Sequence, residues 1–143
     1  MRLENKRAII TGAGTGIGRS IAERFCTEGA EVMVAEIEIE GGKETVKQII
    51  NSGGKAIFQE TDTSNEDSVQ SMIEATVSEF GGIDIVVNNA AAFVFGAIED
   101  TGPEEWTKVL GVNVQGYANT IKSALPFLKK SHNAAIVNVA SVS

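Results

Sequence analysis

The chain has few of the residues on which several classes of protein site depend. It contains one cysteine, Cys26, and one histidine, His132. A single cysteine cannot form an internal disulfide, which suits a reducing compartment. A lone histidine leaves little for a metal site or for a Ser–His–Asp triad. These scarcities argue against a disulfide-stabilised secreted domain, a metalloprotein and a triad hydrolase, and they predict a cytoplasmic location.

A basic surface and a long apolar run are also missing. Lysine and arginine together number 12 against 19 acidic residues, which gives a net charge of −7. Nucleic acids and anionic membranes both need a basic face on their partner. The longest apolar stretches have the length of strands, and no N-terminal segment joins a basic region to a long apolar run. We therefore expect no nucleic-acid partner, no membrane partner and no signal peptide.

What the 143 residues do contain is a regular alternation of β-branched runs and helical stretches. Their length fits one domain, and no linker, repeat or low-complexity segment divides them, so we predict a single domain over residues 1–143. Short β-branched runs of this kind are typical of buried strands. The predicted strands are Lys6–Thr11, Glu31–Glu36, Lys55–Glu60, Ile83–Asn88 and Ala134–Ala140.

Helical stretches separate these runs. The clearest has its apolar residues on one face, a capping box formed by Ser64 and Asp67 before it, and Gly81–Gly82 as its stop. The longest is expected in two pieces, because Gly111, Gly116 and Pro126 interrupt it. The predicted helices are Ile17–Glu28, Gly42–Ser52, Glu66–Phe80 and Glu104–Lys130.

Strict alternation of strand and helix predicts an α/β fold with a parallel sheet and helices on both faces. Right-handed crossovers leave few topologies, and the Rossmann-like, doubly wound order 3-2-1-4-5 is the leading one for five strands. In that arrangement ligands bind beyond the carboxyl ends of the strands. Residues that follow each strand are therefore the candidates for a functional site.

A glycine-rich turn, TGAGTGIG at residues 11–18, follows the first predicted strand. Its spacing is G-x-x-x-G-x-G at Gly12, Gly16 and Gly18 rather than G-x-G-x-x-G. The physical requirement for a dinucleotide site is still met, because the backbone of such a turn approaches a pyrophosphate and the next helix directs free N–H groups at it. A tight strand-to-helix turn that binds nothing is the alternative.

Glu36 ends the second predicted strand, 18 residues beyond Gly18. That is close to the spacing expected of an acid that binds a ribose 2′-hydroxyl. A carboxylate there also repels a 2′-phosphate, by roughly 3 kcal/mol per unit charge at about 5 Å in an effective dielectric near 20. We therefore predict NAD as the cofactor, with NADP disfavoured. A solvated acidic loop that includes Glu38 and Glu40 is the alternative.

Polar residues follow the third and fourth predicted strands as well. Asp62, which precedes Thr63, could accept from an adenine amino group or cap the following helix. Asn88 and Asn89 could brace the neighbouring strand and contact a nicotinamide ribose, although amides at strand ends also serve ordinary turns.

Together these stretches resemble the short-chain dehydrogenase/reductase family in its ordinary, non-extended subtype, and the resemblance covers the whole chain. It rests on TGAGTGIG at 11–18, DT at 62–63, NNAA at 88–91, NVQG at 113–116 and NVAS at 138–141. The resemblance implies an NAD-dependent oxidoreductase that transfers hydride between nicotinamide and a small-molecule alcohol or carbonyl substrate. It also implies a homo-oligomer.

The same resemblance implies roles for individual residues. Ser141 would be the catalytic serine that donates to the substrate oxygen. Asn113 would be the helix asparagine that holds a water of the proton relay, with a helix kink beside Gly111 as the alternative. The cofactor would be bound by Gly12, Thr15, Gly16, Ile17 and Gly18 at the pyrophosphate and adjoining ribose, Glu36 at the adenosine ribose, Asp62 and Thr63 at the adenine, and Asn89, Ala90 and Ala91 at its centre.

The chain departs from the family pattern in three places. Ala91 replaces a glycine, and Glu36 stands where aspartate is more frequent. The third departure concerns the general acid/base, a tyrosine in a Y-x-x-x-K motif whose lysine lowers the tyrosine pKa. The only tyrosine here, Tyr117, is followed at i+4 by Ile121, so a packing role is expected for it. We therefore expect a C-terminally truncated cofactor-binding part of the family fold with little or no activity.

A non-catalytic dinucleotide-binding or interaction module on the same fold is the alternative function. A Y-x-x-x-K motif in the reading frame beyond Ser143 would favour the enzyme, and a stop codon would favour the module. The sequence does not identify a substrate. Only the apolar stretch Ala92–Phe95 is a candidate for its pocket, and a buried loop explains those residues equally well.

Overall fold

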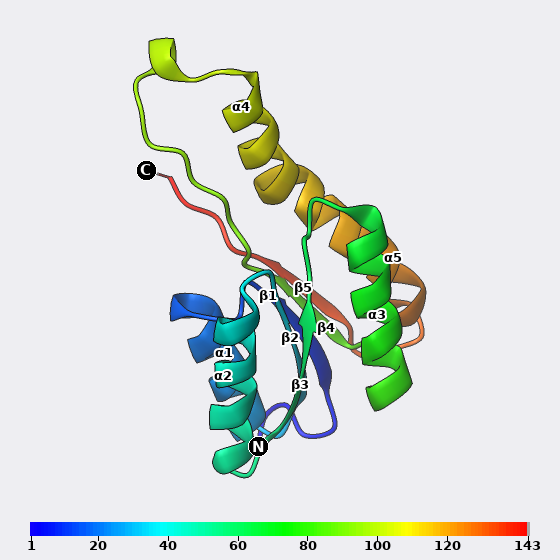
Figure 1. Ribbon diagram of the computed structural model, residues 1–143. Coiled ribbons are helices and arrows are strands. Elements are labelled where there is room, and N and C mark those ends of the chain that lie inside the picture. Colours follow the sequence, from blue (N-terminus) through cyan, green and yellow to red (C-terminus); the bar gives the residue numbers. More distant parts are fainter. Residues whose placement is uncertain (143) are drawn as a thin grey trace.

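A five-stranded parallel sheet with helices on both faces forms the centre of the computed structural model, which describes residues 1–142 (Figure 1). The strand order is β3-β2-β1-β4-β5, and every neighbouring pair is parallel. The doubly wound order 3-2-1-4-5 predicted from the sequence is therefore confirmed. The strands are β1 Arg7–Thr11, β2 Glu31–Glu36, β3 Lys55–Glu60, β4 Ile85–Asn88 and β5 Ala135–Asn138.

Two helices cover each face of the sheet. In Figure 1, α1 (Gly16–Thr27) and α2 (Ile39–Asn51) lie on one side, and α3 (Glu66–Phe80) and α5 (Gly116–Leu128) lie on the other. Between β4 and α5 the chain forms the 3-10 turn η1 (Ile98–Asp100), the helix α4 (Pro103–Leu110) and the π-helical turn η2 (Gly111–Gln115). The loop with η1 and the start of α4 extend beyond the carboxyl edge of the sheet.

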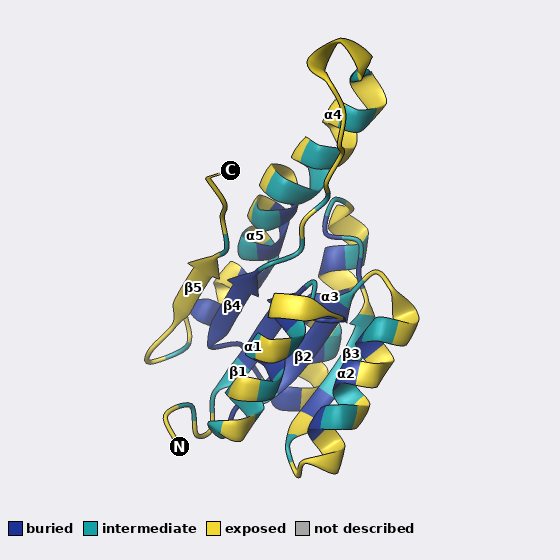
Figure 2. Ribbon diagram, turned by 90° about the vertical axis from the view of Figure 1, so that its left-hand side faces the viewer, coloured by how far each residue is buried: buried dark blue, intermediate teal, exposed yellow. Residues whose placement is uncertain are grey.

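The core consists of two layers because successive strand residues face opposite sides. In β1, Ile10 packs with Val34 of β2 and Ile49 of α2, whereas its neighbour Ile9 packs with Met72 and Ile73 of α3. Strands buried on both faces require near-continuous apolar runs, which explains the residues of β1, β2 and β4. Figure 2 shows these three strands as the buried centre, with β5 exposed at the edge.

Charged groups hold the opposite, amino end of the sheet together. Asp84, only 4% exposed, accepts hydrogen bonds from the backbone and guanidinium of Arg7 and from the hydroxyl of Ser131. Burial raises the pKa of Asp84, but these hydrogen bonds and the charge of Arg7 outweigh it, so the pKa lies well below its ordinary value. The start of the chain is thereby joined to the segments before β4 and β5.

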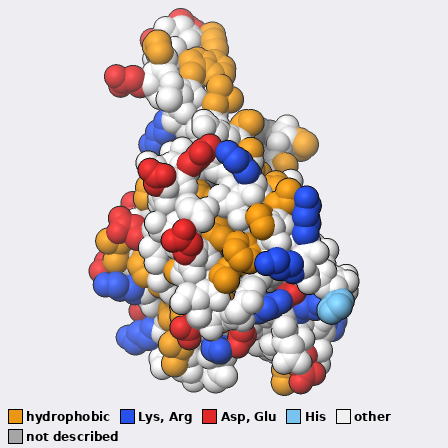
Figure 3. All heavy atoms as spheres, turned by 90° about the vertical axis from the view of Figure 1, so that its right-hand side faces the viewer, with side chains coloured by type: hydrophobic (Ala, Val, Ile, Leu, Met, Phe, Trp, Pro, Cys, Tyr) orange, Lys and Arg blue, Asp and Glu red, His pale blue; other side chains and the backbone are white. Residues whose placement is uncertain are grey.

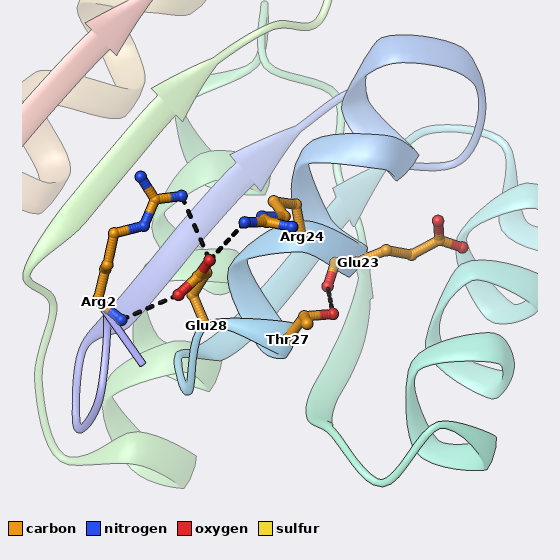
Figure 4. Close-up of polar contacts among 5 residues, drawn as sticks. All are labelled: Arg2, Glu23, Arg24, Thr27 and Glu28. Carbon is orange, nitrogen blue, oxygen red and sulfur yellow. Dashed lines mark hydrogen bonds and ion pairs between the residues drawn. The ribbon is translucent and has the colours of Figure 1, made fainter.

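A second charged contact ties the N-terminus to α1 (Figure 4). Glu28 accepts a hydrogen bond from the backbone N–H of Arg2 at 3.0 Å, and its Oε1 contacts the guanidinium groups of Arg2 and Arg24 at 3.3 and 2.6 Å. The hydrogen bonds from Arg2 and the positive charge of the two arginines lower the pKa of Glu28. These contacts lie far along the strands from the site described below.

The sequence prediction is wrong at several element boundaries. Helix α2 begins at Ile39, three residues before the predicted start at Gly42. The cap of α3 is Asn65, whose Oδ1 accepts from Ser68 N at 3.0 Å, and not Ser64, which is bonded to Asp62 instead. Strands β4 and β5 are each shorter than predicted, whereas α3 has the predicted bounds, with Gly81 as its C-cap.

The long C-terminal helical stretch contains two α-helices, as predicted, although Pro126 does not interrupt it. Gly111 and Gly116 mark a change to a π-helical turn and back rather than a break, and Pro126 lies inside α5. Ala124 and Leu128, on either side of the proline, are buried against the sheet. Their burial outweighs the hydrogen bond that proline cannot donate, so the last turn stays helical.

Candidate functional site

A hollow of about 1320 Å³ lies at the carboxyl ends of the strands, and every residue to which the family resemblance gives a catalytic or cofactor-binding role lines it. These residues come from the turn after β1, the end of β2, the loops after β3 and β4, the turn η2 and the segment after β5. A second hollow of about 1180 Å³, at the amino ends of the strands, contains none of them. The first hollow is also lined by Ile37, Glu38, Thr61, Ala92, Phe93, Lys108, Val112, Tyr117, Asn138, Val139 and Ala140.

The glycine turn gives the hollow an open helix end. Gly16 has a φ of +53°, and apart from its chain neighbours and the backbone of its own helix no atom lies within 4 Å of the place where a Cβ would be. It begins α1, whose first turn contains no acidic residue and whose preceding Thr15 makes no side-chain cap. The first N–H groups of a helix have no partner within the helix. The backbone is therefore arranged as in a site for an anion such as a pyrophosphate.

Hydrogen bonds join this turn to the loop after β4. The hydroxyl oxygen of Thr11 accepts from Asn89 N at 3.0 Å and from Ala90 N at 3.1 Å. The side-chain amide of Asn89 donates to the carbonyls of Thr11 and Gly12, each at 3.1 Å. Asn89 therefore braces the neighbouring strand end. The part played by Thr11 was missed in the sequence, where its place at the head of the glycine stretch was the only signal.

The carboxylate of Glu36 is bound on both oxygens. Its Oε2 accepts from Gly14 N at 2.8 Å, and its Oε1 accepts from the N–H groups of Ile37 and Glu38 at 2.9 and 3.1 Å. Glu38 and Glu40 are exposed, whereas Glu36 is half-buried. Glu36 therefore differs from the rest of its acidic loop in being fixed against the glycine turn.

Asp62 orders the loop after β3. Its Oδ1 accepts from the backbone N–H of Ser64 at 3.0 Å and from the Ser64 hydroxyl at 2.6 Å. This contact forms a turn before α3 and leaves the cap of that helix to Asn65. The adjoining Thr63 is buried, and its carbonyl accepts from the side chain of Asn119 in α5 at 3.0 Å.

Asn113 lies in the π-helical turn η2 and is bonded to the loop after β4. Ala92 N donates to its Oδ1 at 2.8 Å, and its Nδ2 donates to Ala92 O at 2.9 Å. A π-helical turn displaces the backbone carbonyls from their α-helical partners, and such turns are frequent at functional sites. The helix is therefore irregular beside Gly111, as the alternative in the sequence analysis proposed, and Asn113 lies in the middle of the irregular turn.

Tyr117 follows Asn113 by one helical turn and anchors the end of β5. Its hydroxyl donates to the carbonyl of Val139 at 2.8 Å, and Val139 N donates to Asn88 O at 2.9 Å. Burial raises the pKa of the Tyr117 hydroxyl. Ser141 lies two residues beyond this anchor, exposed at the rim of the hollow.

Two features of the loop after β4 bear on the sequence analysis. Asn5 is the only non-glycine residue with a positive φ in the described chain, so Ala91 adopts an ordinary backbone conformation and needs no glycine. The alternative of a buried loop at Ala92–Phe95 is wrong, since the side chains of Phe93 and Phe95 are 68% and 93% exposed. Of these two, only Phe93 lines the hollow.

Within residues 1–142, no group of three or more histidine, cysteine, aspartate or glutamate side chains is arranged to hold a metal ion. None of the helices described over the same residues is long and apolar enough to cross a membrane.

Comparison with known proteins gives consistent matches along the chain. A family model described as short chain dehydrogenase matches residues 6–143. An uncharacterized oxidoreductase of Thermotoga maritima is 40% identical over 99% of this chain and 55% of its own length. The chain spans about half the length of the curated relatives it matches.

Two solved structures share the fold. A short chain dehydrogenase/reductase from Burkholderia phymatum in complex with NAD has a TM-score of 0.94 and 33% identity, over 99% of this chain and 50% of that one. A metagenomic short-chain oxidoreductase in complex with NADP has a TM-score of 0.94 and 26% identity, over 100% of this chain and 65% of that one.

Proposed function

This chain belongs to the short chain dehydrogenase family of oxidoreductases, and from this we propose that it binds NAD in the cytoplasm for hydride transfer to or from an alcohol or carbonyl substrate. The proposal rests on one observation: the open N-terminus of α1 and the hydrogen-bonded carboxylate of Glu36 line the same hollow. A dinucleotide offers a pyrophosphate for the first and a ribose diol for the second.

The residues of the hollow fit the parts of the cofactor in turn. The backbone at Gly16, Ile17 and Gly18 would bind the pyrophosphate, with Gly12 and Thr15 beside it. Glu36 would accept from the adenosine ribose. Asp62 and Thr63 would border the adenine, and Asn89, Ala90 and Ala91 would flank the centre of the cofactor. All of them line the one hollow. The bound nicotinamide would supply or accept the hydride.

Two observations support NAD over NADP. Three backbone N–H groups hold the Glu36 carboxylate at the end of β2, where a 2′-phosphate would meet its negative charge. Among the residues that line the hollow, Lys108 is the only cation, and it belongs to α4 rather than to the β2 end.

The chain's own residues would act on the substrate through Ser141 and Asn113. Ser141 would donate to the substrate oxygen, and Asn113 would hold a water of the proton relay. The sequence has a single tyrosine, Tyr117, whose hydroxyl is bonded to Val139 and which has Ile121 at i+4. It does not supply a tyrosine–lysine pair, so we expect this chain alone to bind the cofactor with little or no turnover.

This expectation keeps a non-catalytic dinucleotide-binding module as the second candidate. Turnover of any alcohol with NAD by this chain, at a rate ordinary for a dehydrogenase, would exclude the module.

The protein also exposes an apolar surface suited to self-association. Trp106 and Leu110 of α4 are 48% and 50% exposed, and Val114 of η2 is 61% exposed. Figure 3 shows apolar side chains on the projection above the sheet. A homo-oligomer would bury them, and sedimentation of the chain at several concentrations measures whether it forms.

The test of cofactor binding is calorimetry with NAD and NADP on the folded chain and two variants. Gly16→Val should abolish NAD binding, because its side chain enters the space for the pyrophosphate and valine is strained at a φ of +53°. Gly53→Val is the matched control, since Gly53 has a φ of +82° with open space around it but lies after α2, outside the hollow. Absence of binding by the unmutated chain, or equal loss in both variants, contradicts the proposal.

A further inference from the structure

Gly14 connects two side chains of opposite charge. Its N–H donates to Oε2 of Glu36 at 2.8 Å, and its carbonyl accepts from the guanidinium of Arg19. A Cβ at position 14 would lie 2.6 Å from Cγ of Glu36 and 2.7 Å from Oε2. Because Gly14 has no side chain, the carboxylate of Glu36 has room to lie beside the glycine turn.

Thr45 of α2 also binds the guanidinium of Arg19. Its side chain is fully buried, and its hydroxyl oxygen accepts from Nε of Arg19 at 2.9 Å. The single hydroxyl proton faces three carbonyls, of Ala13 at 2.9 Å, Gly41 at 3.1 Å and Gly14 at 3.3 Å. The hydroxyl thus joins α1, α2 and the glycine turn at one point.

The charge of Arg19 is not neutralised by a carboxylate. No acidic side chain of residues 1–142 forms an ion pair with it, and its partners are the Thr45 hydroxyl and the carbonyls of Gly14 and Gly41. The half-buried guanidinium of Arg19 is thus bonded to Gly14, which also binds the carboxylate of Glu36. Guanidinium groups bind phosphate by paired hydrogen bonds when they are free to reach it.

We propose that Thr45 is a positioning residue that sets the choice between NAD and NADP, by holding Arg19 on the inner side of the glycine turn so that Glu36 alone faces the adenosine ribose. The inference rests on the proposed binding of a nicotinamide cofactor. It assigns the preference to the pair of Glu36, which repels a 2′-phosphate, and a restrained Arg19, which would otherwise attract it.

Replacement of Thr45 separates this role from a structural one. Thr45→Val keeps the shape and removes the acceptor of Arg19 Nε, so that only the carbonyls of Gly14 and Gly41 restrain the guanidinium and it can turn toward the ribose. We expect the ratio of the NADP and NAD dissociation constants to fall about tenfold, chiefly through tighter NADP binding, since a charge-assisted contact of this kind is worth on the order of one decade. If Thr45 had only a structural role, its replacement would weaken the binding of NAD and of NADP equally, and the ratio of the two dissociation constants would not change.

Matched variants decide the cause. Thr45→Ser retains the hydroxyl and should keep the parent ratio. Thr45→Val with Arg19→Met should lose the gain in NADP affinity, because the released cation is absent. Should Thr45→Val fail to fold by circular dichroism, Arg19→Lys and Arg19→Met serve instead. The shorter donor of Arg19→Lys cannot bond to both Thr45 and Gly14. This variant should therefore bind NADP more tightly than Arg19→Met does.

The measurement is calorimetric titration of the full chain with NAD and NADP at one fixed salt concentration. An unchanged ratio in Thr45→Val, a gain that persists without Arg19, or equal NADP affinities in Arg19→Lys and Arg19→Met would overturn the inference while NAD binding stands. Failure of the unmutated chain to bind either dinucleotide overturns the proposed function itself, and the inference with it.

Discussion

The side-chain amide of Asn113 pairs with the backbone of Ala92 through two hydrogen bonds, one in each direction, at 2.8 and 2.9 Å. A carboxamide has both the acceptor and the donor that this pairing needs, whereas a carboxylate has only acceptors. The identity of the residue in the π-helical turn is therefore fixed by the loop after β4 as much as by any role in catalysis.

Asn113→Asp tests this pairing. The aspartate still accepts from Ala92 N, but its second oxygen faces the Ala92 carbonyl, so we expect the free energy of unfolding to fall by about 1–3 kcal/mol. Urea unfolding at pH 7 measures it. Asn133→Asp, at an exposed position, is the control and should stay within about 0.5 kcal/mol of the parent. Equal stability of Asn113→Asp and the parent would show that the pairing contributes nothing.

Asp84 should make the protein sensitive to acid. Its pKa is held below the ordinary value of 3.8 in the folded chain, so the unfolded chain binds the proton first as pH falls. The stabilisation is complete above about pH 5 and is lost progressively below pH 4. Asp84→Asn should therefore be less stable than the parent at pH 6, with a difference that shrinks toward pH 3.

Denaturant unfolding at several pH values checks this, with Asp100→Asn as an exposed control. A difference between Asp84→Asn and the parent that stays constant from pH 6 to pH 3 would contradict the assignment.

Tyr117 should titrate above its ordinary pKa of 10.0, because burial disfavours the phenolate. A group with a raised pKa in the folded state stabilises the fold below the unfolded pKa, and this contribution is lost as pH rises above about 10. Since Tyr117 is the only tyrosine, the ultraviolet absorbance of the phenolate reports it alone. The titration should move to lower pH in guanidinium chloride, and identical curves in both solvents would refute the prediction.

Cys26 should react slowly with thiol reagents in the folded chain. Burial raises the pKa of its thiol from 9.0 to about 11, and a backbone hydrogen bond with Lys55 offsets this only in part. The thiolate fraction at pH 8 is then about a hundredfold lower than in the unfolded chain, because each pKa unit is a factor of about ten. Reaction with a chromogenic disulfide, with and without denaturant, measures the ratio. Comparable rates would place Cys26 at the surface.

The sheet could be predicted from the sequence because its signals are local and dense. Strands buried on both faces need runs such as Ala8–Ile10 and Val32–Val34, and right-handed crossovers then leave few orders. The early start of α2 could not be predicted in the same way. Gly42 lowers helix propensity, yet the ring of Phe58 fills the space of a side chain there, so the glycine is a packing requirement inside the helix.

The candidate residues after β1, β2, β3 and β4 followed from one rule, that ligands bind where parallel strands end, whereas Asn113 and Ser141 followed from the family resemblance. The contacts among them did not follow. The bonds of Thr11 to Asn89 and of Tyr117 to Val139 join residues far apart in the chain, and nothing in their local sequence distinguishes them from packing residues. Only the folded structure shows that these two hydroxyls form hydrogen bonds with residues that line the hollow.

Three side chains of the η2–α5 segment are bonded to three different strand-end loops: Asn113 to Ala92, Tyr117 to Val139 and Asn119 to Thr63. In dynamic terms, these loops belong to one cooperative unit, since opening any of them breaks a bond to the same helix. Their backbone amides should therefore exchange with deuterium at similar rates, set by the local unfolding of α5 rather than by each loop's own exposure.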